Sequence, residues 1–201
     1  MKHLIKNNQK ATKKLKQNIE TSISNYKLIF SDKNFILKYR KALEILKKSL
    51  KNKGKIIFAG NGGSAADAQH LSAELTGRYL KNRKSISSIS ITTDTSAITS
   101  IANDISYKKI FTRQLEGIAN KNDLFFSITT SGKSENIIDA LSYCKSNNIK
   151  SLCLTKKKYP KKLDKLADIV LDVPANRVDR IQEMHIFIGH NLCEELENTV
   201  K

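Results

Sequence analysis

Apolar residues along the chain repeat with two periods, and the alternation between these periods predicts the order of helices and strands. In residues 33–53, apolar side chains recur every three to four positions, which is the spacing of one helix face. Residues 1–25 predict an earlier helix, and Ser31 and Asp32 are suited to cap the start of the second one. Gly54 then ends the helical pattern before a short apolar run, KIIFAG.

From Gly54 onwards, short apolar runs alternate with helical patterns. The strand candidates are KIIFAG, SISSISIT (85–92), DLFFSIT (123–129), KSLCLT (150–155) and DIVLDVP (168–174). The helical patterns are found at about 65–79, in TSAITSIAN, YKKIFTRQLEGIA, ENIIDALSYCKSN and YPKKLDKLA, and in a long final segment. Strands that alternate with helices imply a mostly parallel sheet with helices on both faces. We therefore predict an α/β three-layer sandwich with five strands, in which residues 1–53 form an N-terminal helical extension and residues 54–201 form one domain.

The final segment, RVDRIQEMHIFIGHNLCEELENTV, predicts a helix that is apolar around much of its circumference. Its apolar residues are Ile181, Met184, Ile186, Ile188, Leu192, Cys193 and Leu196. A helix that is apolar on more than one side needs more than one partner surface. Burial between the sheet and a second subunit meets that need, so we expect a homo-oligomer.

The net charge of +17 raises the question of nucleic-acid binding, because Lys and Arg neutralise phosphates. Only six of the 36 basic residues are Arg, the side chain that base-reading sites favour. The lysines are scattered through segments such as LKKSLKNKGK and KKKYPKKLDKLA. We therefore favour a solvated basic surface over a nucleic-acid-binding patch.

The lengths of the apolar runs and the contexts of the cysteines indicate the compartment of the protein and whether it spans a membrane. No run approaches the roughly 18–20 apolar residues of a membrane span, and the basic N-terminus lacks the apolar core of a secretory signal. Cys144, Cys153 and Cys193 lie in apolar contexts and are odd in number, a pattern typical of free thiols in a reducing compartment. We therefore expect a cytoplasmic protein without a membrane partner.

Two turns rich in Gly, Ser and Thr each follow a predicted buried strand and open a helix. They occur in IIFAGNGGSAADAQH and in FFSITTSGKSENIIDA. Backbone N–H groups, hydroxyls and a helix N-terminus at such a turn suit a phosphate group. Both turns fall at the carboxyl ends of strands, where ligands bind in open α/β sheets. The sequence therefore predicts an anion site formed by both turns.

The first turn also has two other interpretations. One is a tight strand-to-helix connection that needs the backbone freedom of glycine. The other is a dinucleotide fingerprint, because Gly60, Gly62 and Ala65 match G-x-G-x-x-A and Asp94 stands where a ribose-binding acid could lie. A nucleotide fold does not require the His and Glu that the following helix carries on one face. The second turn lacks the spacing of a Walker A loop.

His70 and Glu74 lie four residues apart in QHLSAEL and therefore on one helix face. This spacing gives a metal two ligands or gives a carboxylate base a polar neighbour, with a purely structural pair as the alternative. The final helix supplies further candidates in Gln182, Glu183, His185 and His190. Three of the four histidines in the chain lie in these two helices, which favours a functional interpretation.

Four segments carry a resemblance to a known family: GNGGSAADAQHLSAELTGRY, SIANDISY, TTSGKSENI and RIQEMHIFIGHNLCEELE. They resemble the successive signature segments of phosphoheptose isomerases, which belong to the sugar-isomerase (SIS) domain class. The resemblance runs from about residue 35 to the C-terminus, in order and with natural spacing. It implies a flavodoxin-like SIS domain, one zinc ion per subunit and a homotetramer. The implied reaction converts sedoheptulose 7-phosphate to D-glycero-D-manno-heptose 7-phosphate, a step towards surface polysaccharides.

The resemblance also assigns roles to individual residues. It implies zinc binding by His70, Glu74, Gln182 and His190 and places Arg78 and Asp179 nearby. The implied substrate-binding residues are Asn61, Gly62, Gly63, Ser64, Glu74, Asn103, Asp104, Thr129, Thr130, Ser131, Ser134 and Gln182. An aldose–ketose isomerase needs a base near the carbon and an acid at the oxygens, and we expect Glu74 and His190 in these roles. Lys133 and Thr129 replace the usual Asn and Ser of the family but keep phosphate-compatible chemistry.

A regulator of replication initiation that binds the initiator protein DnaA is the nearest alternative within the SIS class. It shares the fold and the IQEMH segment, but it lacks acid and histidine counterparts of Glu74 and His190. Both residues are present here, so we predict an enzyme rather than an interaction protein. A sugar-phosphate-sensing domain and a dinucleotide enzyme remain as further alternatives.

The spacing within the final helix bears on assembly. Gln182 and His190 are eight residues apart, which separates them by about 12 Å of rise on a regular helix. Two ligands of one zinc ion must each lie about 2.0–2.2 Å from it, so one straight helix supplies both only with strain. We therefore predict an active site shared between subunits, with the final helices at the centre of the oligomer.

Overall fold

Five strands lie side by side in one parallel sheet in the computed structural model, which describes the backbone of residues 2–199 and the side chains of residues 10–199. The strands are β1 (Ile56–Gly60), β2 (Ser88–Ser90), β3 (Leu124–Ile128), β4 (Lys150–Lys156) and β5 (Ile169–Val173). Their order is β2-β1-β3-β4-β5, and every pairing is parallel. This is the flavodoxin-like order, and the predicted α/β sandwich is confirmed.

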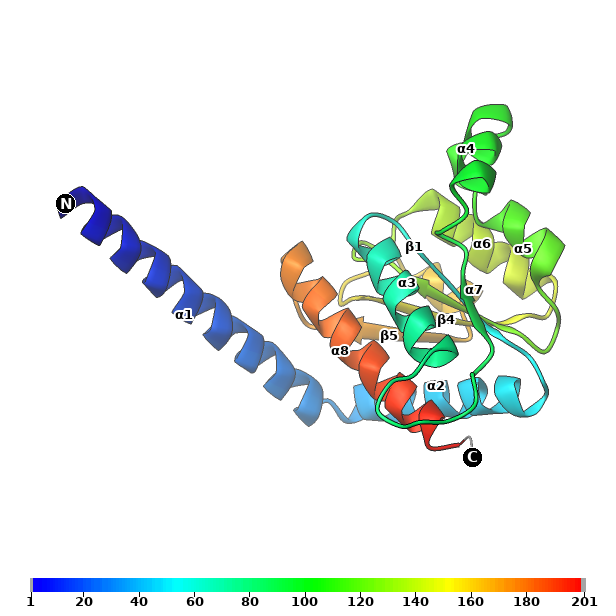
Figure 1. The fold of residues 1–201 in the computed structure, drawn as a ribbon, viewed down its shortest axis with the longest axis horizontal. Coiled ribbons are helices and arrows are strands. Elements are labelled where there is room, and N and C mark those ends of the chain that lie inside the picture. Colours follow the sequence, from blue (N-terminus) through cyan, green and yellow to red (C-terminus); the bar gives the residue numbers. More distant parts are fainter. Residues whose placement is uncertain (1, 200–201) are drawn as a thin grey trace.

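Helices cover both faces of this sheet (Figure 1). They are α1 (Lys2–Ser31), α2 (Lys33–Lys51), α3 (Gly63–Thr76), α4 (Thr95–Asp104), the 3-10 helix η1 (Tyr107–Lys109), α5 (Thr112–Ile118), α6 (Glu135–Ser146), α7 (Leu163–Leu166) and α8 (Val178–Glu197). Helices α2, α3 and α8 pack on one face, and α5, α6 and α7 pack on the other. None of the helices in the described part of the chain combines the length and hydropathy needed to cross a bilayer.

The central strands are apolar at successive positions because both of their faces are buried. β1 and β3 are buried at every residue. Phe58 and Phe126 point to the face covered by α2, α3 and α8, while Ile57 and Phe125 point to the opposite face. Alternate side chains of a strand point to opposite sides, so one strand supplies both hydrophobic clusters.

Several element boundaries differ from the predictions. α1 continues to Ser31, beyond the predicted end at residue 25, and Asp32 caps α2 by accepting hydrogen bonds from two backbone N–H groups. β2 has only three residues and pairs only with β1, at the edge of the sheet. The helical pattern of YKKIFTRQLEGIA is divided between η1 and α5. The division of the chain at residue 53 stays a prediction, and α2 packs into the core with the sheet.

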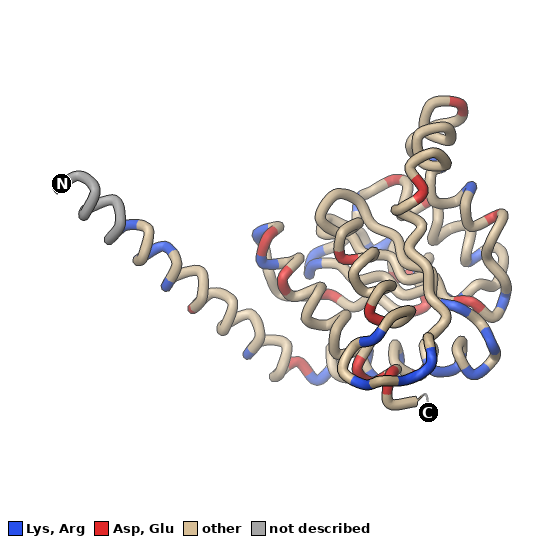
Figure 2. Tube along the Cα trace, in the orientation of Figure 1, with Lys and Arg blue, Asp and Glu red and all other residues tan. Residues whose placement is uncertain are grey.

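Helix α1 projects away from the body, as Figure 1 shows. Its inner side is mixed: Ser22 and Asn25 are buried there, and Tyr26 and Ile29 pack against the core. Its outer side carries Leu15, Ile19 and Ile23, which are spaced four residues apart and are each about half exposed. Figure 2 shows Lys and Arg on α1, on α2 and on the loops around the sheet, with Asp and Glu between them.

A buried ion pair joins the segment that follows α3 to the end of α8. Arg83 and Glu197 have side chains only 2% and 1% exposed, and Arg83 Nε lies 3.4 Å from Glu197 Oε2. Arg83 also donates to the backbone carbonyls of Glu74, Leu75 and Gly77, the last at 3.1 Å. The last carbonyl groups of a helix have no partner within the helix, and Arg83 donates to them here, together with the N–H of Ile86, which donates to the carbonyl of Leu75 at 3.0 Å. The guanidinium group therefore holds the end of the helix that carries His70.

We predict that Arg83→Met lowers the free energy of unfolding by about 3–5 kcal/mol, because it leaves Glu197 as an unpaired buried charge. Chemical denaturation at one fixed protein concentration measures the change. Arg113→Ala is the matched control, because Arg113 pairs with Glu116 at the surface and should contribute less than about 1 kcal/mol. Equal losses in the two variants would contradict the role assigned to Arg83.

Candidate functional site

The first predicted turn links β1 to α3 and packs against the start of α8. At Gly62 the backbone has a φ of +56°, which glycine adopts readily, and the chain turns sharply into the helix. Gly63 lies so close to the side-chain amide of Gln182 that a β-carbon at this position would overlap it. The turn therefore places Asn61 and the N-terminus of α3 at the carboxyl end of β1.

Close packing of α3 against α8 brings three of the predicted site residues together. A β-carbon at Gly189 would overlap the side chain of Leu71, so the two helices approach closely at this point. His70 and Glu74 lie on α3, and His190 lies on α8. One potential ligand atom from each of these residues lies within 4.8 Å of the others.

The geometry of this cluster fits a metal ion. His70 Nε2 lies 2.8 Å from His190 Nε2 and 3.2 Å from Glu74 Oε1. Two bonds of about 2.0–2.1 Å to a tetrahedral zinc ion separate the ligand atoms by about 3.3 Å. Two imidazoles and one carboxylate are also donor types that zinc accepts. The residues therefore suit a divalent cation without a large rearrangement.

The surroundings of His190 favour its neutral form. Tyr79 stacks on its ring, with centroids 5.5 Å apart and an interplanar angle of 13°. Burial lowers the pKa of His190, and nearby His70 lowers it further, while Glu74 opposes the shift. Neutral imidazole is the form that binds metals. His190 is therefore prepared either to bind a cation or to accept a proton.

Gln182, the fourth ligand candidate, lies at the other end of α3. Its amide contacts Gly63, whereas His190 lies beside His70. Gly63 and His70 are seven residues apart, which corresponds to about 10 Å along the helix axis. One chain therefore groups three of the four candidates and places Gln182 beside the first turn. The predicted sharing of the site between subunits now concerns Gln182 and stays a prediction.

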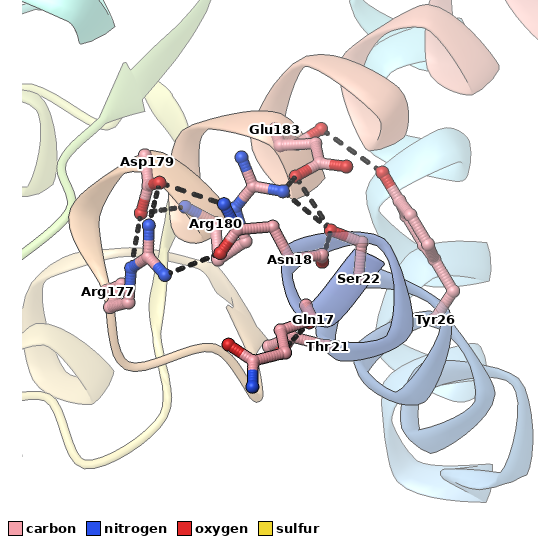
Figure 3. Close-up of polar contacts among 9 residues, drawn as sticks. All are labelled: Gln17, Asn18, Thr21, Ser22, Tyr26, Arg177, Asp179, Arg180 and Glu183. Atoms are coloured by element: carbon pink, nitrogen blue, oxygen red, sulfur yellow. Dashed lines mark hydrogen bonds and ion pairs between the residues drawn. The ribbon is translucent and has the colours of Figure 1, made fainter. Parts of the chain in front are cut away.

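Two other candidates on α8 lie outside this cluster. Glu183 faces α1, where Oε2 accepts from Ser22 Oγ at 3.1 Å and lies 2.6 Å from Arg180 Nη1 (Figure 3). His185 is fully buried, and burial lowers its pKa to about 4. The backbone of Thr155 opposes this shift in part, but neither ring nitrogen of His185 makes a well-formed hydrogen bond within the described residues. Both residues therefore serve the packing of α8.

The second predicted turn, between β3 and α6, gathers hydroxyl groups around a bend. Thr129 Oγ1 lies 3.3 Å from Ser134 Oγ and accepts from the N–H of Gly132 at 3.2 Å. Ser131 Oγ accepts from the N–H of Lys133 at 3.1 Å. Ser134 is the N-cap residue of α6, yet its side chain makes no capping hydrogen bond. Its hydroxyl group therefore lies beside Thr129 at a helix N-terminus, where anions bind favourably.

The remaining substrate candidates are less closely grouped. Asn103 Nδ2 donates to Asp104 Oδ1 at 2.7 Å at the exposed end of α4, which stands away from the sheet in Figure 1. Neither residue makes a side-chain hydrogen bond to another candidate within the described part of the chain. Ser64 is buried, Thr130 is half-buried and Arg78 is exposed. Convergence of these residues on one ligand stays a prediction.

Three residues near these groups were not predicted from the sequence. Asn136 exchanges two hydrogen bonds with Asn61, each of 2.9 Å. The hydroxyl of Tyr107 donates to Asn61 Oδ1 at 3.0 Å, and Tyr79 stacks on His190. Asn136 lies two residues after Ser134 of the second turn, and Tyr107 ends the segment SIANDISY. These positions next to predicted site segments were the only signals in the sequence that Asn136 and Tyr107 belong to the site, and they do not show which side chains meet.

The dinucleotide interpretation of the first turn finds no support in the fold. Asp94, the candidate ribose-binding acid, caps α4 by accepting from the N–H of Ala97 at 2.9 Å. The strand order also differs from the 3-2-1-4-5-6 order of the dinucleotide fold.

Comparisons with known proteins agree with the resemblance found in the sequence. The model of the SIS domain family matches residues 33–156. Phosphoheptose isomerase of Sulfurimonas denitrificans is 42% identical over 188 residues, which cover 94% of this chain and 96% of that protein. The enzyme of Aliarcobacter butzleri is 49% identical over 158 residues, covering 79% of this chain and 83% of that protein.

A solved structure gives the same answer. The phosphoheptose isomerase of Neisseria gonorrhoeae superposes with a TM-score of 0.85 at 33% identity, covering 93% of this chain and 98% of that one. The chain belongs to the phosphoheptose isomerase family of SIS-domain proteins.

Proposed function

We propose that the protein converts sedoheptulose 7-phosphate to D-glycero-D-manno-heptose 7-phosphate, which supplies heptose for surface polysaccharides. The observation that carries this proposal is the grouping of His70, Glu74 and His190 on two helices, one of which opens from the first Gly-rich turn. Phosphoheptose isomerases that are 42% and 49% identical to the chain support this substrate class.

The reaction moves a proton between C1 and C2 and another between their oxygens. Glu74 Oε1 faces His70, whereas Glu74 Oε2 makes no hydrogen bond among the described residues. We assign the transfer of the carbon-bound proton to this second oxygen, so that one carboxylate acts both as a ligand and as a base. We assign the exchange of the oxygen-bound proton to His190, whose pKa is lowered by burial; its Nε2 can bind the metal or carry this proton, but not both at once.

We propose zinc as the metal, held by His70, Glu74 and His190. When bound, zinc polarises a carbonyl group as a Lewis acid and stabilises negative charge on its oxygen. The family resemblance implies Gln182 as a fourth ligand. Because Gln182 lies beside Gly63 in its own chain, we propose that a neighbouring subunit supplies this ligand.

We propose that the two turns bind different parts of the substrate beside this metal centre. Thr129, Ser131 and Ser134 hold the phosphate group, with Thr130 beside them and Ser64 from the first turn. Asn61, Gly62 and Gly63 line the sugar, and Asn103 and Asp104 approach it from α4. The hydroxyl cluster at the start of α6 supports the phosphate assignment, because a helix N-terminus favours an anion.

We propose that the protein assembles as a homotetramer. The apolar stripe of Leu15, Ile19 and Ile23 on α1 has no partner within the described chain. An apolar groove of about 430 Å³ lies between α1, α2 and α8, and Phe30 at its edge is 84% exposed. Both surfaces are suited to a second copy of the chain. A central position of α8 would also bring Gln182 near a neighbouring site.

The alternative of a non-catalytic protein that binds DnaA is disfavoured by the complete His70, Glu74 and His190 cluster. A cytoplasmic location is proposed from the three cysteines, which are all free and buried, as is typical of a reducing compartment. Sugar phosphates are made and used in that compartment.

We predict that Glu74→Gln retains the fold but lowers kcat at least about a hundredfold, because it removes the base while keeping its size. Nuclear magnetic resonance detection of the aldoheptose phosphate formed from sedoheptulose 7-phosphate measures turnover. Glu116→Gln, an exposed change on α5, is the control and should leave kcat unaltered. Chelation should lower wild-type activity, and added zinc should restore it. Near-normal turnover by the Glu74 variant would refute its role.

We predict that Ser131→Ala mainly weakens substrate binding, by about 1–3 kcal/mol, because it removes a hydrogen bond to a charged phosphate. Steady-state kinetics should show KM rising about five- to 150-fold while kcat changes less. Ser146→Ala, at the exposed end of α6, is the matched control. An unchanged KM in the Ser131 variant would place the phosphate elsewhere.

We predict that the wild-type protein is a tetramer in solution and that replacing Ile19 and Ile23 with Ser shifts it to smaller species. The substitutions remove apolar area that a neighbouring chain would bury. Sedimentation velocity measures the distribution, and Lys16→Ser serves as the control on the same helix. A wild-type monomer with full activity would contradict the proposed assembly.

A further inference from the structure

One side chain of α6 connects the two Gly-rich turns. Asn136 Nδ2 donates to Asn61 Oδ1, and Asn136 Oδ1 accepts from Asn61 Nδ2, each at 2.9 Å. Asn136 is only 2% exposed, whereas Asn61 is half-buried at the end of β1. A single pair of side-chain amides therefore joins the turns that follow the neighbouring strands β1 and β3.

The backbone fixes the direction of each hydrogen bond in this pair. Asn136 Oδ1 also accepts from the N–H of Ile137 at 2.9 Å. An amide nitrogen has no lone pair to accept that bond, so the amide of Asn136 has only one satisfactory orientation. Asn61 must then present its nitrogen to Asn136 Oδ1 and its oxygen to Asn136 Nδ2.

Tyr107 completes the pairing of Asn61. Its hydroxyl donates to Asn61 Oδ1 at 3.0 Å, so both lone pairs of this oxygen are occupied. One of the two N–H groups of Asn61 is bonded to Asn136. The other has no partner among the described residues. The available part of the amide is therefore a hydrogen-bond donor and not an acceptor.

We propose that Asn136 is a positioning residue of the isomerase, which holds Asn61 so that its free N–H donates to an oxygen of the sugar phosphate. The inference rests on the proposed function, in which Asn61 contacts the substrate. Carbonyl, hydroxyl and phosphate oxygens all accept such a bond. A donor that is oriented before binding adds affinity with little further loss of side-chain entropy.

The same pair sets the distance between the two parts of the site. Asn136 lies two residues after Ser134, so its bond to Asn61 holds the first turn at a fixed separation from the hydroxyl cluster of the second. The substrate-binding groups of the two turns are therefore held at a fixed spacing before a sugar phosphate binds across them. Asn136 contributes to this geometry through its hydrogen bonds to Asn61.

The decisive variant is Asn136→Asp, which keeps the size and shape of the side chain. It replaces the Nδ2 donor with an acceptor that faces Asn61 Oδ1, so Asn61 loses its fixed orientation. We expect KM for sedoheptulose 7-phosphate to rise about five- to 150-fold, the range for a buried polar group that loses its partner, with a smaller change in kcat. Asn147→Asp, at the exposed end of the same helix, should leave both constants unchanged.

A double-variant cycle separates positioning from a general structural role. In an Asn61→Ala background there is no amide left to orient, so adding Asn136→Asp should change KM less than twofold. A merely structural role would make the two effects multiply. Multiplying effects, or an unchanged KM in the single Asn136 variant, would overturn the proposal. Thermal unfolding of each variant confirms that folded protein is assayed.

Tyr107→Phe is a second variant in case Asn136→Asp does not fold. It removes only the hydroxyl that donates to Asn61, and we expect KM to rise about two- to tenfold in the wild-type background. The rise should be absent in the Asn61→Ala background, and its persistence there would count against positioning through Asn61. A wild-type protein that does not turn over sedoheptulose 7-phosphate would instead refute the proposed function, and the positioning role with it.

Discussion

The contact between α3 and α8 is the constraint on which the candidate metal centre depends. Gly189 leaves no side chain where Leu71 packs, so the two helix backbones can approach closely. That approach brings His190 Nε2 to 2.8 Å from His70 Nε2, although the residues are 120 positions apart in the chain. A larger residue at position 189 would separate the helices and the potential ligands together. Function therefore depends on a residue that has no functional group of its own.

Buried polar groups on and near the same helices are accommodated in two ways. Arg83 and Glu197 are both buried, but each neutralises the other, and Arg83 also satisfies backbone carbonyls at the end of α3. His185 solves the problem differently, because burial lowers its pKa to about 4 and it remains uncharged near neutral pH. Above its unfolded pKa of about 6.5 there is no proton-linked cost, because His185 is neutral in both states, whereas below it the unfolded chain binds a proton that the folded chain excludes. Its burial therefore weakens the fold as the pH falls from about 6.5 towards about 4.

Rigid and projecting parts of the molecule have separate tasks. The sheet and its covering helices fix the two turns, and the Asn61–Asn136 pair ties those turns together at the carboxyl edge. Helix α1 extends beyond this body and is held to α8 by polar contacts, such as Arg180 Nη1 donating to Ser22 Oγ at 2.7 Å (Figure 3). Its apolar stripe faces outwards, which suits assembly rather than chemistry.

The sequence by itself determined the order of strands and helices, since buried strands and amphipathic helices differ in apolar period. It also determined that His70 and Glu74 share a helix face and that two Gly-rich turns follow strands. It did not set the limits of the edge strand β2 or divide the segment after Tyr107, because these depend on neighbouring elements. Only the tertiary structure decided that His190 meets His70 and that Asn136 meets Asn61. Periodicity defines the faces of each element, but side-chain volumes and packing between distant elements decide which faces touch.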